Sequence, residues 1–98
     1  MKLLTKAIKK NIPALYGQDG KGGDAVAHAK LFTPDGNWAW YITEMNPETG
    51  ECFGLVDGFE KELGYFSLKE VERVRGGLGL PVERDRWFTP CKLSDLKQ

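Results

Sequence analysis

Five acidic side chains fall at expected strand ends and turns, and they carry the groups best suited to chemistry. They are Glu44, Glu60, Glu62, Glu83 and Asp85. Paired carboxylates can hold Mg²⁺ or serve as acid and base. Both roles need the carboxylates within a few ångströms of one another, and no spacing here requires that. A solvated acidic edge or an anionic patch facing a partner is the preferred interpretation, and a metal-assisted enzyme built on this set is an alternative.

The remaining reactive side chains form no familiar constellation. The two cysteines, Cys52 and Cys91, lie far apart, and His28 is the only histidine. A structural zinc site needs about four such ligands at close spacing. A nucleophilic triad needs a Ser or Cys beside an oriented base. We therefore predict no catalytic residue, no metal site and no cofactor, and the sequence favours a non-enzymatic protein with reduced thiols.

The run N-W-A-W-Y-I-T-E at residues 37–44 predicts a strand with two different faces. Alternation places Trp38, Trp40, Ile42 and Glu44 on one side and Ala39, Tyr41 and Thr43 on the other. We expect the indoles to face the core. Tyr41 then faces outward, either as a half-exposed sheet residue or, with Phe53 or Tyr65 beside it, as an aromatic platform for a partner.

A basic amphipathic helix is predicted over residues 3–12, where Pro13 stops it. The cations on this helix and directly before it are Lys2, Lys6, Lys9 and Lys10. With Tyr65 as a stacking ring, these lysines suggest an alternative function in binding nucleic acid. The charge balance argues against it, because 14 basic and 14 acidic side chains cancel, and residues 31–62 carry seven acids and one lysine.

The run E-R-D-R at residues 83–86 alternates in sign. In an extended segment the two acids share one face and the two arginines share the other. Exposed ion pairs contribute only about 0–1 kcal/mol, so this arrangement suits register or recognition better than stability. Arg84 and Asp85 are therefore candidate contact residues.

The elements that must position these groups are typical of an α+β domain. Strands are expected at residues 25–33, 38–43, 52–56 and 63–66, separated by the turn sequences T-P-D-G-N and M-N-P-E-T-G-E and by Asp57-Gly58. A second helix is expected from Ser67, where S-L-K-E matches a capping box, to Gly76-Gly77. The prediction is an antiparallel sheet of four strands, or five with Trp87-Phe88, with two helices packed on one face.

Length and composition set the class of protein. Ninety-eight residues make a single domain, 1–98, and 41% hydrophobic with 29% charged residues is ordinary for a globular protein. Lysines interrupt the only apolar N-terminal stretch, and no run of 18 apolar residues could span a membrane. We expect a cytoplasmic protein without a membrane partner.

Five segments of the sequence carry a resemblance to a known family. They are N-W-A-W-Y-I-T-E, F-G-L-V-D-G-F-E-K-E-L-G-Y-F-S-L-K-E-V, G-L-P-V-E-R-D-R-W-F, the L-T-K start and the closing P-C-K-L-S-D-L. Together these segments resemble an uncharacterised bacterial and phage family. Its members are small single-domain proteins of unknown function, common on plasmids, conjugative elements and prophages. The resemblance implies a mobile-element accessory role that interferes with or adapts host defence or replication machinery, and it carries over no catalytic residue.

The leading hypothesis is therefore a protein-binding module that combines an exposed aromatic ring with charged rims. The residues expected to contact the unidentified protein partner are Tyr41, Glu44, Glu60, Glu62, Arg84 and Asp85.

Overall fold

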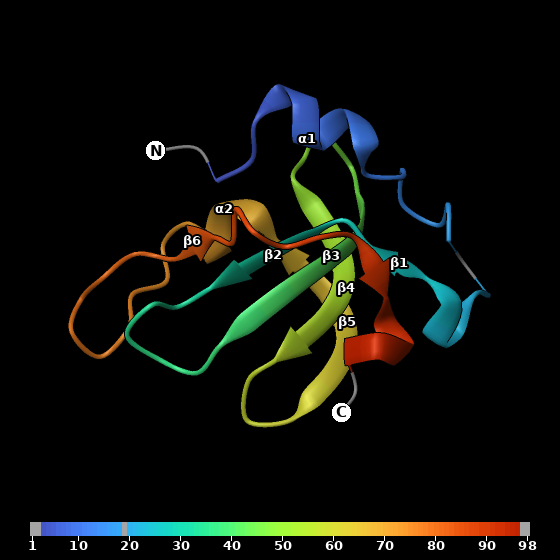
Figure 1. Ribbon diagram of the computed structural model, residues 1–98. Helices are drawn as coiled ribbons and strands as arrows, with labels where there is room; N and C mark the ends of the chain where they lie inside the picture. The colour runs from blue at the N-terminus through green and yellow to red at the C-terminus, as the bar shows by residue number, and fades with distance from the viewer. Residues whose placement is uncertain (1–2, 19, 97–98) are drawn as a thin grey trace.

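A five-stranded antiparallel sheet forms the centre of the protein, as a computed structural model shows (Figure 1). The structure describes residues 3–18 and 20–96. The strand order is β5-β4-β3-β2-β6, and every neighbouring pair is antiparallel. The strands are β2 (Ala29–Phe32), β3 (Ala39–Met45), β4 (Glu51–Asp57), β5 (Lys61–Ser67) and β6 (Glu83–Arg84). The predicted antiparallel sheet is confirmed.

The turns that join β2, β3 and β4 lie where the turn chemistry predicts them. Thr33 and Gly36 shape the turn before β3: Thr33 Oγ1 accepts the backbone N–H of Trp38 at 3.0 Å, and the N–H of Gly36 donates to the Thr33 carbonyl. Asn46 closes the next turn, since its side chain accepts the N–H of Glu48 at 2.9 Å. These local bonds fix the register of the meander.

The predicted strand over residues 25–33 is divided in the structure. Its first part, β1 (Val26–Ala27), leaves the large sheet and pairs with β7 (Cys91–Lys92). Its second part, β2, pairs with β3. Short 3₁₀ turns, η1 (Gly22–Asp24) and η2 (Leu93–Leu96), flank this two-stranded sheet. Because β7 is only two residues long and lies far along the chain, local sequence gives no signal for the pairing.

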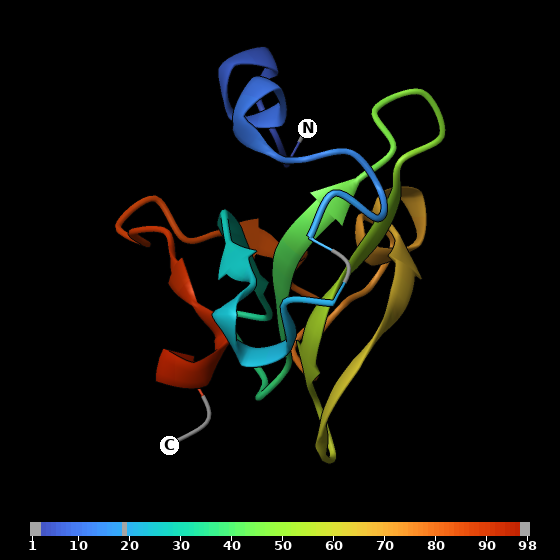
Figure 2. The ribbon, with the colours of Figure 1, turned by 90° about the vertical axis from the view of Figure 1, so that its right-hand side faces the viewer.

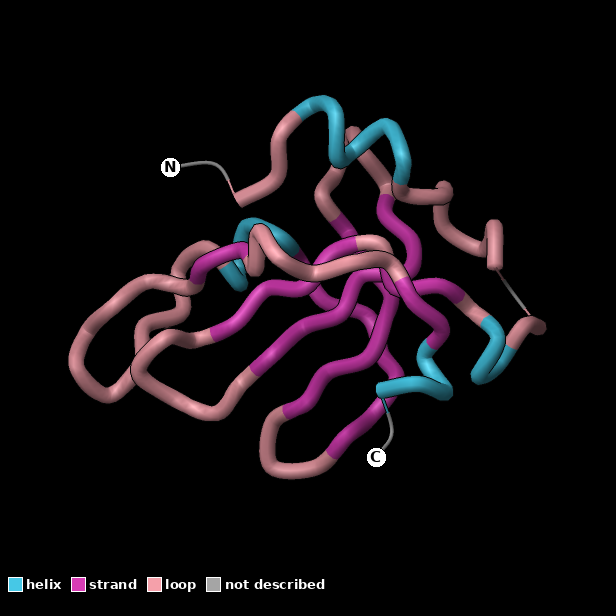
Figure 3. The backbone as a smooth tube through the Cα atoms, in the orientation of Figure 1, coloured by secondary structure: helices cyan, strands magenta, loops and turns pink. Residues whose placement is uncertain are grey.

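Helices supply little of the structure (Figure 3). α1 (Lys6–Asn11) has no fully buried residue, and α2 (Leu68–Val71) is a single turn. The predicted cover of two helices packed on one face is therefore not shown. The capping-box prediction is wrong, since the Ser67 side chain makes no cap bond, whereas Thr5 does cap α1 by accepting the N–H of Ile8 at 3.2 Å. None of the described helices is long and apolar enough to cross a membrane.

Both faces of the sheet bury apolar side chains. We call the face with Trp40 and Ile42 the tryptophan face, and the face with Tyr41 and Leu55 the tyrosine face. The larger core lies on the tryptophan face and includes Leu3, Leu4, Ile12, Leu31, Trp40, Ile42, Met45, Cys52, Leu68, Val71 and Val82. The smaller core lies on the tyrosine face, where Ala25, Ala27, Leu55 and Leu93 are buried and Tyr41, Phe88 and Leu96 pack against them. The two-stranded sheet thus covers part of the face that the sequence predicted to be open (Figure 2).

A β-bulge in β3 changes which face the end of that strand presents. Ile42 pairs with Gly54 and Glu44 pairs with Phe53, so β3 has one more residue than β4 across this step. Beyond a bulge, each side chain points to the sheet face opposite to the one that regular alternation predicts. Met45, opposite Cys52, consequently joins the larger core, and Glu44 faces the tyrosine face. The prediction that Glu44 shares a face with the indoles is wrong for this reason.

The fifth strand is β6, not Trp87-Phe88. β6 pairs with β2 through Leu31 and Arg84. The turn that follows leaves the Trp87 side chain 93% exposed, while Phe88 packs on the smaller core. The expected fifth strand at Trp87-Phe88 is not formed, because the N–H of Trp87 donates to Asp85 Oδ1 in a tight turn that directs the ring outward.

Candidate functional site

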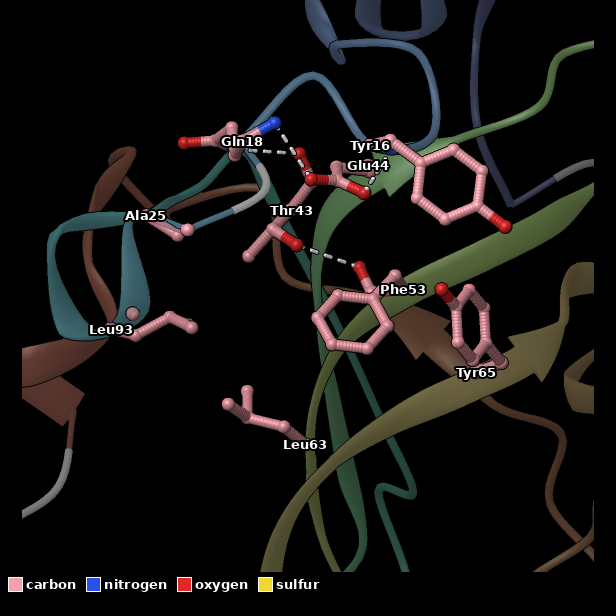
Figure 4. A pocket seen from close by; sticks show the side chains of 11 residues that line it. Tyr16, Gln18, Ala25, Thr43, Glu44, Phe53, Leu63, Tyr65 and Leu93 are labelled. Carbon is pink, nitrogen blue, oxygen red and sulfur yellow. Dashed lines mark hydrogen bonds between the residues drawn. The ribbon is translucent and has the colours of Figure 1, made fainter.

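A buried carboxylate fastens the loop before β1 to the end of β3. The backbone N–H of Tyr16 donates to Glu44 Oε1 at 2.7 Å, and the N–H of Gln18 donates to Glu44 Oε2 at 2.8 Å (Figure 4). Hydrogen bonds from N–H groups to a carboxylate are shorter and stronger than neutral ones. Glu44 itself is only 5% exposed. Its carboxylate therefore holds the loop in one position.

Gln18 and Thr43 complete this attachment. Gln18 Nε2 donates to the carbonyls of Val26 and Thr43, and its Oε1 accepts the N–H of Val26 at 2.6 Å. Thr43, the extra residue of the bulge, donates its hydroxyl to the Phe53 carbonyl at 2.9 Å. The polar side chains in this region are thus engaged by the fold.

The attached loop and the tyrosine face together enclose a concave site, which we call the tyrosine cleft. Its volume is about 360 Å³, at the small end for ligand sites. Tyr16, Phe53 and Tyr65 supply its aromatic lining, with Phe53 and Tyr65 packed edge to face at 4.8 Å. Figure 4 shows the hydroxyls of Tyr16 and Tyr65 turned to the same gap, with Leu63 below Phe53 and Leu93 across the cleft.

The backbone at Tyr16 is in the left-handed region, with a φ of 70°. Tyr16 is the only described residue other than glycine with a positive φ. Such a conformation costs a residue with a Cβ about 1–2 kcal/mol. The Glu44 hydrogen bond holds Tyr16 in this conformation, which brings its ring over the cleft.

Negative charge dominates the electrostatics of the tyrosine cleft. The pKa of Tyr65 is raised by a side-chain hydrogen bond with Tyr16, by partial burial and by the carboxylates of Glu44 and Glu51. The two ion pairs found in the described part of the chain, Lys30–Asp85 and Lys92–Asp24, do not involve Glu44. Among the described residues, the Glu44 carboxylate is therefore stabilised by backbone N–H groups rather than by a cation.

The structure separates the residues predicted for partner binding. Tyr41 is half-buried. Its ring lies 5.9 Å from that of Phe88, so the 85–92 segment covers it. On the same ring, Lys30 Nζ lies 5.6 Å from the centroid. Phe53 and Tyr65, which were expected beside Tyr41, line the tyrosine cleft together with Tyr16. Glu44 is buried, and both of its carboxylate oxygens accept hydrogen bonds from the backbone of the loop before β1. Neither Tyr41 nor Glu44 forms an exposed rim.

Glu60 and Glu62 do lie on an exposed aromatic surface. Phe59 is 94% exposed at the tip of the β4–β5 hairpin and meets the Trp38 ring at 5.4 Å, and Trp38 stacks on Trp40 at 6.0 Å. A hollow of about 460 Å³ there is lined by Trp38, Val56, Phe59, Glu60 and Glu62, which we call the hairpin surface. Trp38 is 36% exposed, so only one of the two indoles is buried as predicted.

Arg84 and Asp85 lie at the other edge of the sheet, four strand spacings of about 4.8 Å from the hairpin edge. Asp85 pairs with Lys30 at 3.9 Å. Arg84 lines a hollow of about 350 Å³, and its Nε and Nη1 are shielded from solvent with no acceptor among the described residues. This pair therefore does not share a surface with Glu60 and Glu62.

The residues of the two alternatives are also dispersed. Within residues 3–18 and 20–96, no three His, Cys, Asp or Glu side chains gather as a metal site would require. Lys6, Lys9 and Lys10 line one groove with Ile12, Ala14, Met45 and Pro47, away from Tyr65, which lines the tyrosine cleft. Lys2 lies outside the described residues.

Sequence reasoning missed most of the tyrosine cleft. Phe53 and Tyr65 could have been paired in advance, because each lies four residues from the turn that joins Asp57 to Lys61. Tyr16 and Leu93 carry no such signal, since loop 13–18 and η2 reach the tyrosine face only through tertiary contacts.

Comparison with known proteins identifies the family but no activity. No curated protein and no solved structure matches the chain significantly. The model of a family described as "Protein of unknown function (DUF2958)" matches residues 3–96, nearly the whole chain. The small α+β domain with its tyrosine cleft and hairpin surface therefore belongs to the DUF2958 family of proteins of unknown function.

Proposed function

We propose that this protein is a non-enzymatic protein-binding module that uses the hairpin surface to hold a basic segment of its partner. The observation that carries the proposal is the fully exposed Phe59 ring, backed by Trp38 and bordered by two carboxylates. Large rings in a hollow with charged rims have the composition of interface hot spots.

The negative charge of the hairpin surface indicates what kind of partner segment it can bind. In the pairing of β4 with β5, Glu62 lies opposite Val56, on the tryptophan face. Lys61 Nζ donates to the Leu96 carbonyl, so this cation is directed toward the tyrosine face. Glu60 and Glu62 thus present negative charge beside the rings. A partner segment with Lys or Arg next to an apolar anchor is complementary to this surface.

The biological setting of this proposal is the one that the sequence resemblance implies. The module acts in the cytoplasm as a mobile-element accessory, where its binding interferes with or adapts host defence or replication machinery. A single-domain protein that only occupies another protein's surface needs no catalytic group.

Site-specific photo-crosslinking in cells tests the proposal. A photoreactive phenylalanine at position 59 is expected to capture one protein partner through a segment rich in Lys or Arg. The matched control carries the same residue at position 87, where the native ring is equally exposed. Equal capture at both positions, or an acidic captured segment, contradicts the proposal.

Nucleic-acid binding remains the second candidate, because three lysines line one groove. It predicts salt-sensitive retention on single-stranded DNA that is lost when Lys6, Lys9 and Lys10 are changed to Gln. A Phe59→Ser variant is expected to keep that retention if the lysine groove binds the DNA without the hairpin surface.

A further inference from the structure

The tyrosine cleft contains a buried negative charge with no cation beside it. Glu44 lines the cleft and is 5% exposed, and no Lys, Arg or His nitrogen lies within 4.0 Å of its oxygens in the described ranges. The two backbone N–H groups that it accepts stabilise the carboxylate without cancelling its charge. In surroundings of low dielectric such a charge attracts a cation more strongly than it would in water.

The rings of the cleft add attraction of the same sign. Tyr16, Phe53 and Tyr65 converge on one hollow, with the rings of Phe53 and Tyr65 4.8 Å apart. The face of an aromatic ring is negative, and cations bind over it. Tyr65 is half exposed and stands at the open side, so a ligand can reach the rings from solvent.

Most polar groups of the cleft are already engaged by the fold, which disfavours other ligand classes. The Gln18 amide and the Thr43 hydroxyl are engaged by backbone groups, and both Glu44 oxygens accept backbone N–H groups. A divalent metal ion needs several free oxygen ligands. A neutral polar molecule needs free donors and acceptors, whereas the Tyr16 and Tyr65 hydroxyls are hydrogen-bonded to each other. The cleft offers ring faces, apolar side chains and negative potential instead.

We propose that the tyrosine cleft binds an organic cation of the alkylated ammonium class. Such a group carries positive charge on an apolar, weakly hydrated surface, which suits a carboxylate beneath aromatic rings. The volume of about 360 Å³ accommodates one such headgroup. The proposal is independent of the hairpin surface, since Phe59 and Trp38 do not line this cleft.

The fold prepares the cleft before any ligand arrives. Tyr16 keeps its left-handed backbone through the 2.7 Å bond to Glu44, so the same carboxylate that attracts the cation also fixes one wall. The raised pKa of Tyr65, to which the Glu44 and Glu51 carboxylates contribute, agrees with a negative potential at the rings. A site that is already ordered avoids the entropy cost of ordering it on binding.

NMR titration with choline and with its neutral carbon isostere tests the proposal. Choline is expected to shift the ring signals of Tyr16, Phe53 and Tyr65, and to bind at least about fivefold more tightly than the isostere, as expected for about 1 kcal/mol of cation–π attraction. A peptide carrying trimethyl-lysine identifies the source of the cation: about tenfold tighter binding than choline indicates a protein side chain, and equal binding indicates a free small molecule.

Matched variants separate the ring from its hydroxyl. Tyr65→Leu is expected to lose at least about fivefold in choline affinity, whereas Tyr65→Phe and the distant Trp87→Leu bind as the wild type does. Tyr65 and Trp87 are both exposed, so these variants keep the fold. Equal affinity for choline and the isostere, shifts confined to another surface, or wild-type binding by Tyr65→Leu overturns the proposal.

Discussion

Glu44 accepts the backbone N–H of Tyr16 at 2.7 Å across 28 positions of sequence. This bond joins a loop with no regular structure to the end of a central strand. It exists because the bulge at Thr43 directs Glu44 to the tyrosine face rather than into the core around Trp40. One extra residue in a strand therefore decides where the cleft lies.

Glu44→Ala is expected to lower the free energy of unfolding by about 2–4 kcal/mol, because it leaves the N–H groups of Tyr16 and Gln18 without their acceptor. Urea denaturation measures the loss. Glu48→Ala is the matched control, since Glu48 is exposed in the turn before β4. Equal stability of the two variants would show that Glu44 does not hold the loop.

The left-handed backbone of Tyr16 predicts an unusual order of stabilities. Tyr16→Gly should be more stable than Tyr16→Ala by about 1 kcal/mol, because glycine adopts a positive φ without a Cβ clash. Both variants lose the same ring, so their difference reports the backbone alone. Thermal or urea unfolding decides the order, and a more stable alanine variant would contradict it.

Gly54 and Gly64 are cross-strand partners with opposite expected responses to alanine. A Cβ at Gly54 would overlap the Tyr41 carbonyl oxygen, whereas one at Gly64 meets nothing within 4 Å. Gly54→Ala is therefore expected to destabilise the protein by about 2–3 kcal/mol, and Gly64→Ala to change its stability by no more than about 0.5 kcal/mol. Similar unfolding midpoints for the two variants would argue against this register.

Cys52 should make stability fall at high pH. Burial, with a smaller contribution from Glu51, raises the pKa of its thiol to about 12. Between pH 9 and pH 12 the unfolded chain has released this proton while the folded protein keeps it, so rising pH favours unfolding. The expected slope is about 1.4 kcal/mol per pH unit.

The measurement compares the pH dependence of urea unfolding for the wild type and Cys52→Ala between pH 8 and pH 10.5. The variant is expected to lose the part of the slope that Cys52 causes. Cys91→Ala is the comparison: burial and Asp95 also raise the pKa of this thiol, but Cys91 is only partly buried, so its removal is expected to take away a smaller part of the slope. Identical slopes for the wild type and Cys52→Ala would show that the buried thiol does not titrate in this way.

The sequence alone determined the strands of the meander and the turns between them. Local groups carry that information: Thr33 and Asn46 bond to backbone groups a few residues away, and these bonds form in nearly any context. The pairing of Phe53 with Tyr65 was also available from the sequence, because a tight turn fixes which residues face one another, but we predicted each of them only as a neighbour of Tyr41.

Tertiary structure alone decided the remainder. The bulge moved Glu44 to the other face, and the pairing of β1 with β7 brought Leu93 onto the tyrosine face and left Phe88 against Tyr41. The β1–β7 pairing and the contact of Phe88 with Tyr41 join segments far apart in the chain, and the Glu44 side chain that the bulge redirects bonds to Tyr16, 28 positions away. Their free energy comes from burial and hydrogen bonds that exist only after the chain has closed, so no local pattern records them.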